Sequence, residues 1–215
     1  MRYKILNFVL PLIICQSLFL SACSKEEFVK VETSAMQIPV FANQNEPSII
    51  FPIFEGWVGK EPKVTPDYVL HLFYDKKYAN LKYPPGSMVL GISTKALPTQ
   101  IFPIKKVVND TYNQNKKNLT VIESSKVEKL EEHGRVGYYF WIVTKNKSDK
   151  NLLDFTYHYE TMIGDKSSGY RHVYINYIEQ ALNPDNVKTI KTTNYINAKM
   201  HSKYMKYSNP NNFKI

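Results

Sequence analysis

Three stretches of the chain decide the fold: VGYYFWIVT (136–144), LLDFTYHYETMI (152–163) and YRHVYINYIE (170–179). Each is rich in Tyr, Phe, Val and Ile, which are enriched in β-strands. The short polar loops 145–151 and 164–169 separate them, and loops of that length commonly join antiparallel neighbours. The three stretches therefore predict an antiparallel three-stranded meander.

The middle stretch alternates between two kinds of side chain. One face receives Leu153, Phe155, Tyr157 and Tyr159, and the other receives Asp154, Thr156, His158 and Glu160. This alternation predicts a strand with one buried face and one face in water.

Further elements are expected around the meander. Apolar residues at helical spacing after Pro103 predict a helix over 103–114, and Asn183-Pro184-Asp185 predicts a second helix to about residue 200. The stretches 49–60, 87–94 and 119–123 are typical of strands, and a short strand near 36–42 is also possible from the pattern.

Two segments admit two interpretations each. Thr65-Pro66-Asp67 is a helix-start signature that favours a helix over 66–81, whereas the branched and aromatic run 68–74 favours a strand. In 125–133, Ser125 with Glu128 resembles a capping box, whereas the same residues could form a hairpin arm that turns at His133-Gly134.

Together these elements predict a single α+β domain with an antiparallel sheet, its C-terminal part a three-strand meander, packed by two or three helices. About 165 residues are enough for one core. This order of elements resembles the PsbP/Mog1-like group of small α+β domains. The resemblance concerns the fold and implies nothing about function.

The N-terminus carries a targeting signal. Two positive charges in Met1–Lys4 precede the mostly apolar stretch 5–20, which is short for a membrane-spanning helix, and Leu20-Ser21-Ala22-Cys23 follows. This tetrapeptide resembles the bacterial lipobox. The resemblance implies cleavage between Ala22 and Cys23, diacylglycerol on the Cys23 sulfur, and acylation of the new amine. The alternative is a secretory signal cut nearby that leaves Cys23 as a free thiol.

The chain accordingly divides into four predicted parts. Residues 1–22 are a lipoprotein signal peptide, 23–48 a lipidated N-terminus and tether, 49–187 the α+β domain, and 188–215 a basic C-terminal helix or tail. Two or three acyl chains anchor a protein stably. Ser24 follows the cysteine, and by the same resemblance a residue other than Asp there implies the outer membrane, facing the periplasm.

The net charge of +9 is unevenly distributed. Residues 23–187 carry 20 basic and 19 acidic side chains, so the body is near neutral. Residues 188–215 contain no acid and hold six lysines, including Lys188, Lys191, Lys199, Lys203 and Lys206. A solvated tail that aids solubility is the simpler interpretation, and contact with a membrane, lipopolysaccharide or an acidic protein is the alternative. No recognised nucleic-acid motif is present, so nucleic acid is not an expected partner.

No standard catalytic signature occurs in the sequence, and no metal site or other cofactor is expected. His158 and Glu160 share one strand face about 7 Å apart, a spacing that suits an acid–base pair or a bridging metal. His172 lies on the next predicted strand. It shares their face if the position numbers of directly opposed residues on these two strands add to an even sum, and otherwise it lies on the other face. The alternative is an ordinary polar, solvent-facing strand.

The function predicted from the sequence is that of a non-enzymatic, lipid-anchored envelope protein that binds a protein partner in the periplasm. An immunity-type inhibitor and an envelope-assembly accessory both fit. Aromatics on both faces of 136–144 place some outside the main core side, where exposed aromatics favour protein contacts, although core packing and strand propensity explain them too. The competing classes are an envelope-acting hydrolase that uses His158 and Glu160, and a lipid or ligand carrier.

Overall fold

The computed structural model describes residues 33–39, 48–81, 84–132, 134–147, 149, 151–181, 201 and 203–208. They belong to one compact unit, Glu32–Ile215. The predicted lipobox with Cys23, the second predicted helix, and the lysines at 188, 191 and 199 lie outside the described residues. None of the helices described has the length and apolar character needed to cross a membrane.

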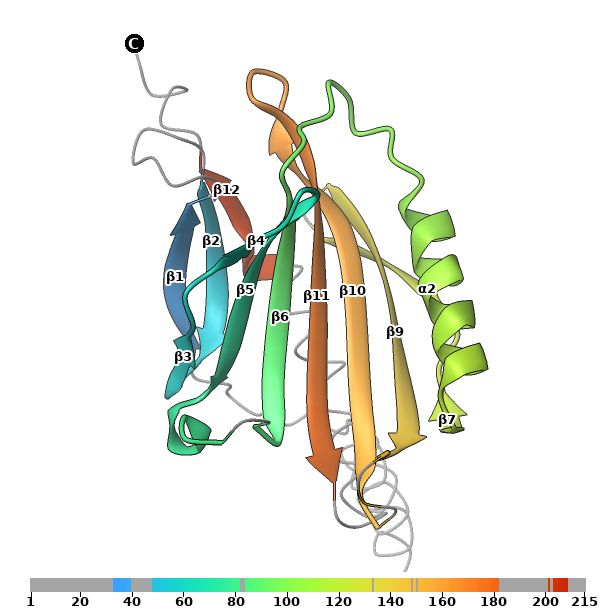
Figure 1. Cartoon of the computed structure of the whole chain (residues 1–215). Helices are drawn as coiled ribbons and strands as arrows, with labels where there is room; N and C mark the ends of the chain where they lie inside the picture. The colour runs from blue at the N-terminus through green and yellow to red at the C-terminus, as the bar shows by residue number, and fades with distance from the viewer. Residues whose placement is uncertain are drawn as a thin grey trace, which may run out of the picture. The chain divides into compact units, whose positions relative to one another are not determined.

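Two antiparallel sheets and one long helix make up the described part of the chain (Figure 1). The small sheet has the order β1-β2-β12, from Thr33–Pro39, Ser48–Phe54 and Lys206–Ser208. The large sheet has the order β3-β5-β6-β11-β10-β9-β7, and β4 and β8 pair with β5 and β9. Its strands are β3 (Trp57–Gly59), β4 (Lys63–Val64), β5 (Tyr68–Asp75), β6 (Gly86–Ser93), β7 (Val121–Ser124), β8 (Glu128–Glu132), β9 (Arg135–Lys145), β10 (Leu153–Asp165) and β11 (Gly169–Ala181). The helix is α2 (Ile104–Asn118), and η1 (Lys76–Tyr78) is a short 3-10 turn.

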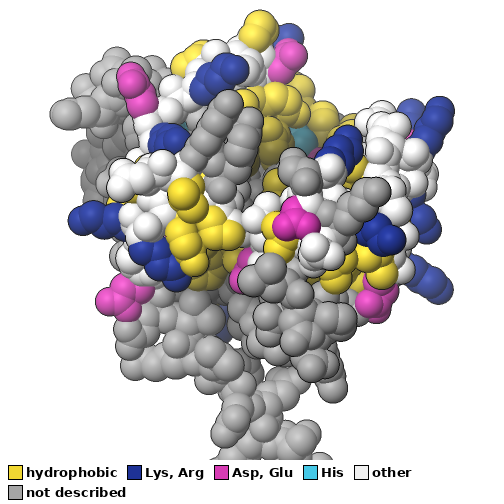
Figure 2. All heavy atoms as spheres, turned by 60° about the horizontal axis from the view of Figure 1, so that its bottom comes forward, with side chains coloured by type: hydrophobic (Ala, Val, Ile, Leu, Met, Phe, Trp, Pro, Cys, Tyr) yellow, Lys and Arg dark blue, Asp and Glu magenta, His cyan; other side chains and the backbone are white. Residues whose placement is uncertain are grey.

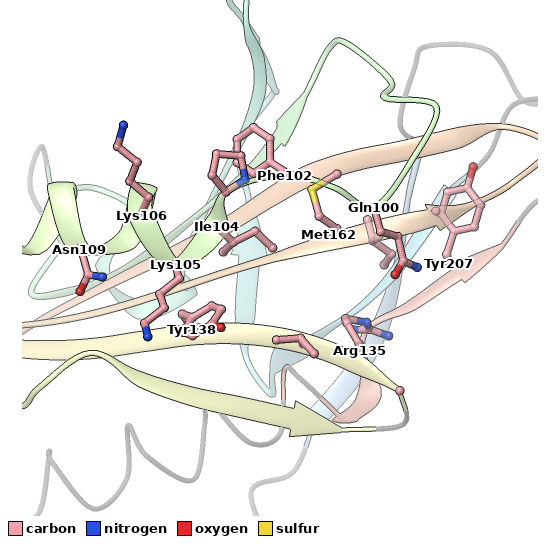
Figure 3. Close-up of a pocket in the computed structure, with 15 residues that line it drawn as sticks. Gln100, Phe102, Ile104, Lys105, Lys106, Asn109, Arg135, Tyr138, Met162 and Tyr207 are labelled. Carbon is pink, nitrogen blue, oxygen red and sulfur yellow. The ribbon is translucent and has the colours of Figure 1, made fainter.

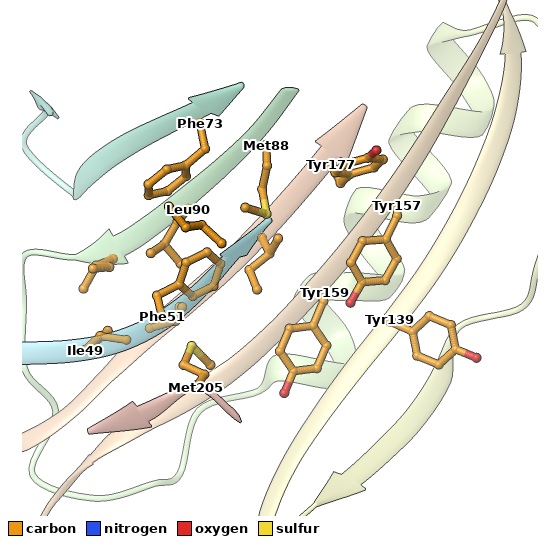
Figure 4. Close-up of a cluster of buried hydrophobic side chains, with 14 of the residues drawn as sticks. Ile49, Phe51, Phe73, Met88, Leu90, Tyr139, Tyr157, Tyr159, Tyr177 and Met205 are labelled. Carbon is orange, nitrogen blue, oxygen red and sulfur yellow. The ribbon is translucent and has the colours of Figure 1, made fainter. Parts of the chain in front are cut away.

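The large sheet is the middle of three layers. One of its faces packs on the small sheet, where Phe51 of β2 lies among residues such as Phe73 and Leu90 (Figure 4). On the other face, Ile104 and Val108 of α2 pack on Phe140, Ile142 and Met162. Neighbours on β9 alternate between the two clusters, because successive side chains of a strand point to opposite faces.

The predicted meander is confirmed as β9, β10 and β11, and the helix predicted over 103–114 as α2. Of the two interpretations of 66–81, the strand is right and the helix is wrong, because Thr65 caps the start of β5 through hydrogen bonds with Tyr68. In 125–133 the hairpin arm is right, as β8 paired with β9. The described residues hold one long helix where two or three were expected, and residues 201, 203 and 204 are also helical.

The end of the chain is part of the core. Met205 is fully buried and His201 nearly so, and β12 pairs with β2 beside them. Lys203 and Lys206 are exposed. The interpretation of residues 188–215 as a solvated tail is therefore wrong for His201 and Met205. At the other end, β1 lies within the range predicted as a tether and pairs with β2 along its length. Every side chain that the structure describes as buried lies after residue 47, so a chain that starts at residue 24 retains the whole described core.

Candidate functional site

A pocket of about 850 Å³ opens where the start of α2 meets the ends of β9 and β10 (Figure 3). Its apolar lining includes Phe102, Ile104, Val136, Tyr138 and Met162. The segment before α2 contributes Gln100, Phe102 and Pro103, and Tyr207 of β12 completes one side. The pocket thus combines a hydrophobic floor with walls from four separate parts of the chain.

The charged side chains that line this pocket are all cationic. They are Lys105, Lys106 and Arg135, and no Asp or Glu occurs among its described lining residues. Arg135 donates from Nη2 to the Met205 carbonyl at 2.6 Å, which fixes its guanidinium beside the pocket. In Figure 3, Lys105 extends from α2 toward Tyr138, whereas Lys106 extends in the opposite direction.

The start of α2 adds to this positive potential. No side chain caps its first turn, and no acidic residue occurs there. Acidic side chains are favoured at helix N-termini because the helix dipole is positive at that end. Lys105 and Lys106 occupy this turn instead. The pocket therefore has an unneutralised positive end, which suits a negatively charged group.

Behind the pocket, on the α2 face of the sheet, lie the three residues selected from the sequence. The position numbers of opposed residues on β10 and β11 do add to an even sum, as with Met162 and His172, so both histidines share a face. His158 Nε2 lies 2.6 Å from Glu160 Oε1, and His172 Nε2 lies 2.7 Å from Glu160 Oε2. The Tyr68 hydroxyl lies 2.9 Å from His172 Nδ1.

This His158–Glu160–His172–Tyr68 network is buried. The exposed fractions of His158, Glu160 and His172 are 8%, 2% and 4%. The prediction that this face of β10 lies in water is therefore wrong. It is covered by the rings of Phe102, Phe140 and Tyr174, whose centroids lie 4.7 to 6.1 Å from those of the histidine rings. The aromatics of β9 do lie on both faces, with Tyr138 and Phe140 in the cluster under α2, but all of them are buried or half-buried and none is exposed.

Burial and hydrogen bonding act in opposite directions on Glu160. Desolvation raises the pKa of its carboxyl, but the hydrogen bonds from His158 and His172 outweigh it and lower the pKa to about 2. An ionised Glu160 only accepts, so each histidine Nε2 donates to it. The other ring nitrogen of His172, Nδ1, is hydrogen-bonded to the Tyr68 hydroxyl. The donors and acceptors of the network are thus mutually satisfied.

A glycine makes room for the ring that closes this network. Tyr174 crosses Gly91 of β6, where an added Cβ would stand 2.1 Å from the Tyr174 ring. Tyr68 reaches His172 from β5, on the far side of β6. The sequence carried no signal for Tyr68, because it is separated from His172 by 104 positions.

The structure does not build a metal site from these residues. In the described part of the chain, no group of three or more His, Cys, Asp and Glu side chains is arranged to hold a metal ion. Both Nε2 atoms contact the carboxylate directly, whereas a bridging metal would separate them from it. His201 packs against Phe51 on the opposite face of the sheet, with ring centroids 4.9 Å apart.

The pocket residues were not selected from the sequence. They come from 100–109, 134–138, 162–164 and position 207, and only the fold brings them together. The available signal was the pair of lysines in the first turn of a predictable helix, where acids are normally favoured.

Neither a protein-family model nor a curated protein sequence matches the chain. Among solved structures, LpqN of Mycobacterium tuberculosis, which is involved in cell envelope biogenesis, is 15% identical with a TM-score of 0.52. The match covers 81% of this chain and 91% of LpqN. PsbP (CyanoP) of Synechocystis sp. PCC 6803 is 13% identical over 81% of this chain and 92% of that chain, with a TM-score of 0.44. At this identity, the likeness to LpqN is one of fold alone.

Proposed function

We propose that this protein is a lipid-anchored component of a bacterial cell envelope and that its body binds an amphipathic anion in the α2 pocket. The lipobox-like Leu20-Ser21-Ala22-Cys23 supports the anchor. The fold shared with LpqN, whose described role is in envelope biogenesis, is consistent with that location. Outer-membrane attachment facing the periplasm is part of the proposal and rests on Ser24.

The lining of the pocket is the observation that supports an amphipathic anion as the ligand. An apolar floor binds a hydrocarbon portion, and Lys105 and Arg135 bind an anionic group. A volume of about 850 Å³ lies within the range of small-molecule sites. Among the three functional classes that the sequence left open, this geometry favours the ligand carrier.

The other two classes have less support. A protein partner was favoured by aromatics outside the core, yet among the large hydrophobic side chains that are exposed in the described residues, the one aromatic is Tyr204. A hydrolase would need a histidine nitrogen that faces the substrate, whereas both Nε2 atoms contact Glu160. Phe102, which lines the pocket, also stacks on the His172 ring.

The proposal is tested by titration calorimetry on residues 24–215 with three detergents below their micelle concentrations. Dodecyl phosphate, dodecyl maltoside and dodecyltrimethylammonium share one chain and differ in headgroup charge. We expect dodecyl phosphate to bind with the highest affinity. Lys105→Glu should weaken it about tenfold, because a charge-assisted contact becomes repulsive.

Two further variants locate the binding. Val136→Trp should abolish it by filling the pocket, whereas Lys117→Glu, at the other end of α2, should leave it unchanged. Equal affinity for all three detergents, or binding that survives Val136→Trp, would exclude the α2 pocket as an anion site.

A further inference from the structure

One end of the molecule presents an aliphatic side chain to solvent on a fixed loop. Ile101 is 87% exposed, more than any other large hydrophobic residue described. It lies between Gln100 and Phe102, which both line the pocket. Ile101 therefore projects outward from the segment that forms the pocket wall.

The loop that carries Ile101 is held at both ends, so the fold fixes the exposure of this side chain. Leu97 and Tyr170 exchange two backbone hydrogen bonds of 2.7 and 2.8 Å. On the other side of Ile101, Phe102 stacks on His172, and α2 begins at Ile104. An aliphatic side chain fixed in water costs free energy that an apolar environment would recover.

The charge around Ile101 is cationic. Lys106 is exposed on the outer side of α2, and Lys166 is exposed in the β10–β11 turn, which stands at the same end of the molecule in Figure 1. Acids stand at this end as well: Asp67 lies 3.8 Å from the Lys95 amine, and Asp165 accepts hydrogen bonds from the neutral hydroxyls of Ser167 and Ser168. At the opposite end, turned forward in Figure 2, basic, acidic and hydrophobic side chains are interspersed.

We infer that this end, defined by Ile101, Lys106 and Lys166, docks on a bilayer that carries anionic headgroups, with the pocket mouth facing the lipid. Ile101 would insert at the interface, and the lysines would lie at the level of the phosphates. One aliphatic side chain among lysines is too small an apolar area for a stable protein interface. The inference deepens the proposed function and rests on it for the source of the pocket ligand.

The chain enters the body away from this docking end: Thr33 pairs with Phe54, whose ring lies 6.1 Å from that of Tyr177, whereas Leu97 beside the docking end pairs with Tyr170 at the other end of β11. Thr33, the first residue of β1, lies ten positions after Cys23, so a fully extended connection spans at most about 35 Å. If Cys23 is acylated, the body stays within that distance of the membrane. A weak contact then suffices, because the tether raises the effective concentration of lipid.

The test is vesicle flotation with unacylated residues 24–215, so that neither the anchor nor the pocket ligand is needed. Vesicles contain phosphatidylcholine alone or with phosphatidylglycerol. We expect binding to the phosphatidylglycerol vesicles, and about a tenfold weaker partition for Ile101→Ser and for Lys106→Glu. The matched controls are Ile122→Ser and Lys117→Glu, which change an exposed isoleucine on β7 and an exposed lysine at the far end of α2.

Each outcome decides the inference. Absence of binding, equal binding to both vesicle types, or equal losses in the matched controls would overturn it. Two variants distinguish membrane docking from ligand binding in the pocket. Val136→Trp should no longer bind dodecyl phosphate but should still bind vesicles, whereas Ile101→Ser should bind vesicles more weakly and still bind dodecyl phosphate. If vesicle binding fails while dodecyl phosphate binds, the pocket stands and the docking surface does not.

Discussion

The two faces of the large sheet bury histidine in opposite ways. On the small-sheet side, His201 stacks on Phe51 in an apolar layer, and burial lowers its pKa to about 4, so it is held neutral. On the α2 side, His158 and His172 share the carboxylate of Glu160, whose pKa is held near 2. One face therefore avoids a buried charge, and the other keeps a charge and satisfies it with hydrogen bonds.

This difference shows which face is suited to bind a ligand. The small-sheet side is a closed hydrophobic layer. The α2 side combines an ionic network, half-buried tyrosines and a cationic pocket within the reach of one helix. Stability and function are thus expected to separate by face of the large sheet.

The largest expected effect is on the apolar face. Phe51 is fully buried and stacks with Phe73 and His201. Phe51→Ala should lower the free energy of unfolding by about 4 kcal/mol, because a buried ring is lost and a cavity remains. Urea denaturation followed by circular dichroism measures this change. Ile122→Ala, at a half-exposed position of β7, is the control and should cost far less.

The next effect is a pH dependence that originates at His201. Its pKa is lowered in the folded state, from 6.5 to about 4, so the unfolded chain binds the proton more tightly. Stability should therefore fall as the pH drops from 6.5 to about 4, by about 3 kcal/mol from this group. His201→Phe should flatten that part of the profile. An unchanged profile in this variant would show that His201 is not the titrating group.

The ionic network should respond in a different pH window. Glu160→Gln keeps the shape of the side chain but removes the charge that both histidines contact, and should cost about 2 kcal/mol at neutral pH. Because the pKa of Glu160 is lowered from 4.5 to about 2, its contribution is present above pH 4.5 and lost as the pH falls toward 2. The wild-type and Glu160→Gln stabilities, compared by urea denaturation at several pH values, should therefore converge below pH 4.5.

The smallest effect has the opposite sign. Lys106 lies in the first turn of α2, where the helix dipole disfavours a cation, and Lys117 lies in the last turn, where it favours one. Lys106→Glu should raise the free energy of unfolding by about 0.5 kcal/mol, and Lys117→Glu should lower it by a similar amount. Paired thermal melts at low salt resolve such differences. If replacing Lys106 stabilises the fold, the lysine does not serve stability, as expected of a residue that serves binding.

Local pattern was enough to predict the meander, the α2 helix and the shared face of His158 and Glu160, whereas the face of His172 depended on the register between β10 and β11. Period-two and period-3.6 repeats report on local geometry. They could not show that the polar face of β10 is covered, because Phe102 and Tyr174 reach it from other elements. The same holds for Tyr68, for the pocket and for Met205, whose positions depend on contacts between distant parts of the chain.

The pairing of β12 with β2 has a consequence for how the protein is made. About 150 residues separate Phe54 from Lys206, and at ordinary rates of synthesis this interval lasts roughly ten to thirty seconds. Until β12 emerges, β2 has a hydrogen-bonding partner on one edge only, and the layer around Phe51 lacks Met205. The last strand to be synthesised completes the first sheet to appear. A nascent chain therefore exposes this edge of β2 until β12 has been synthesised.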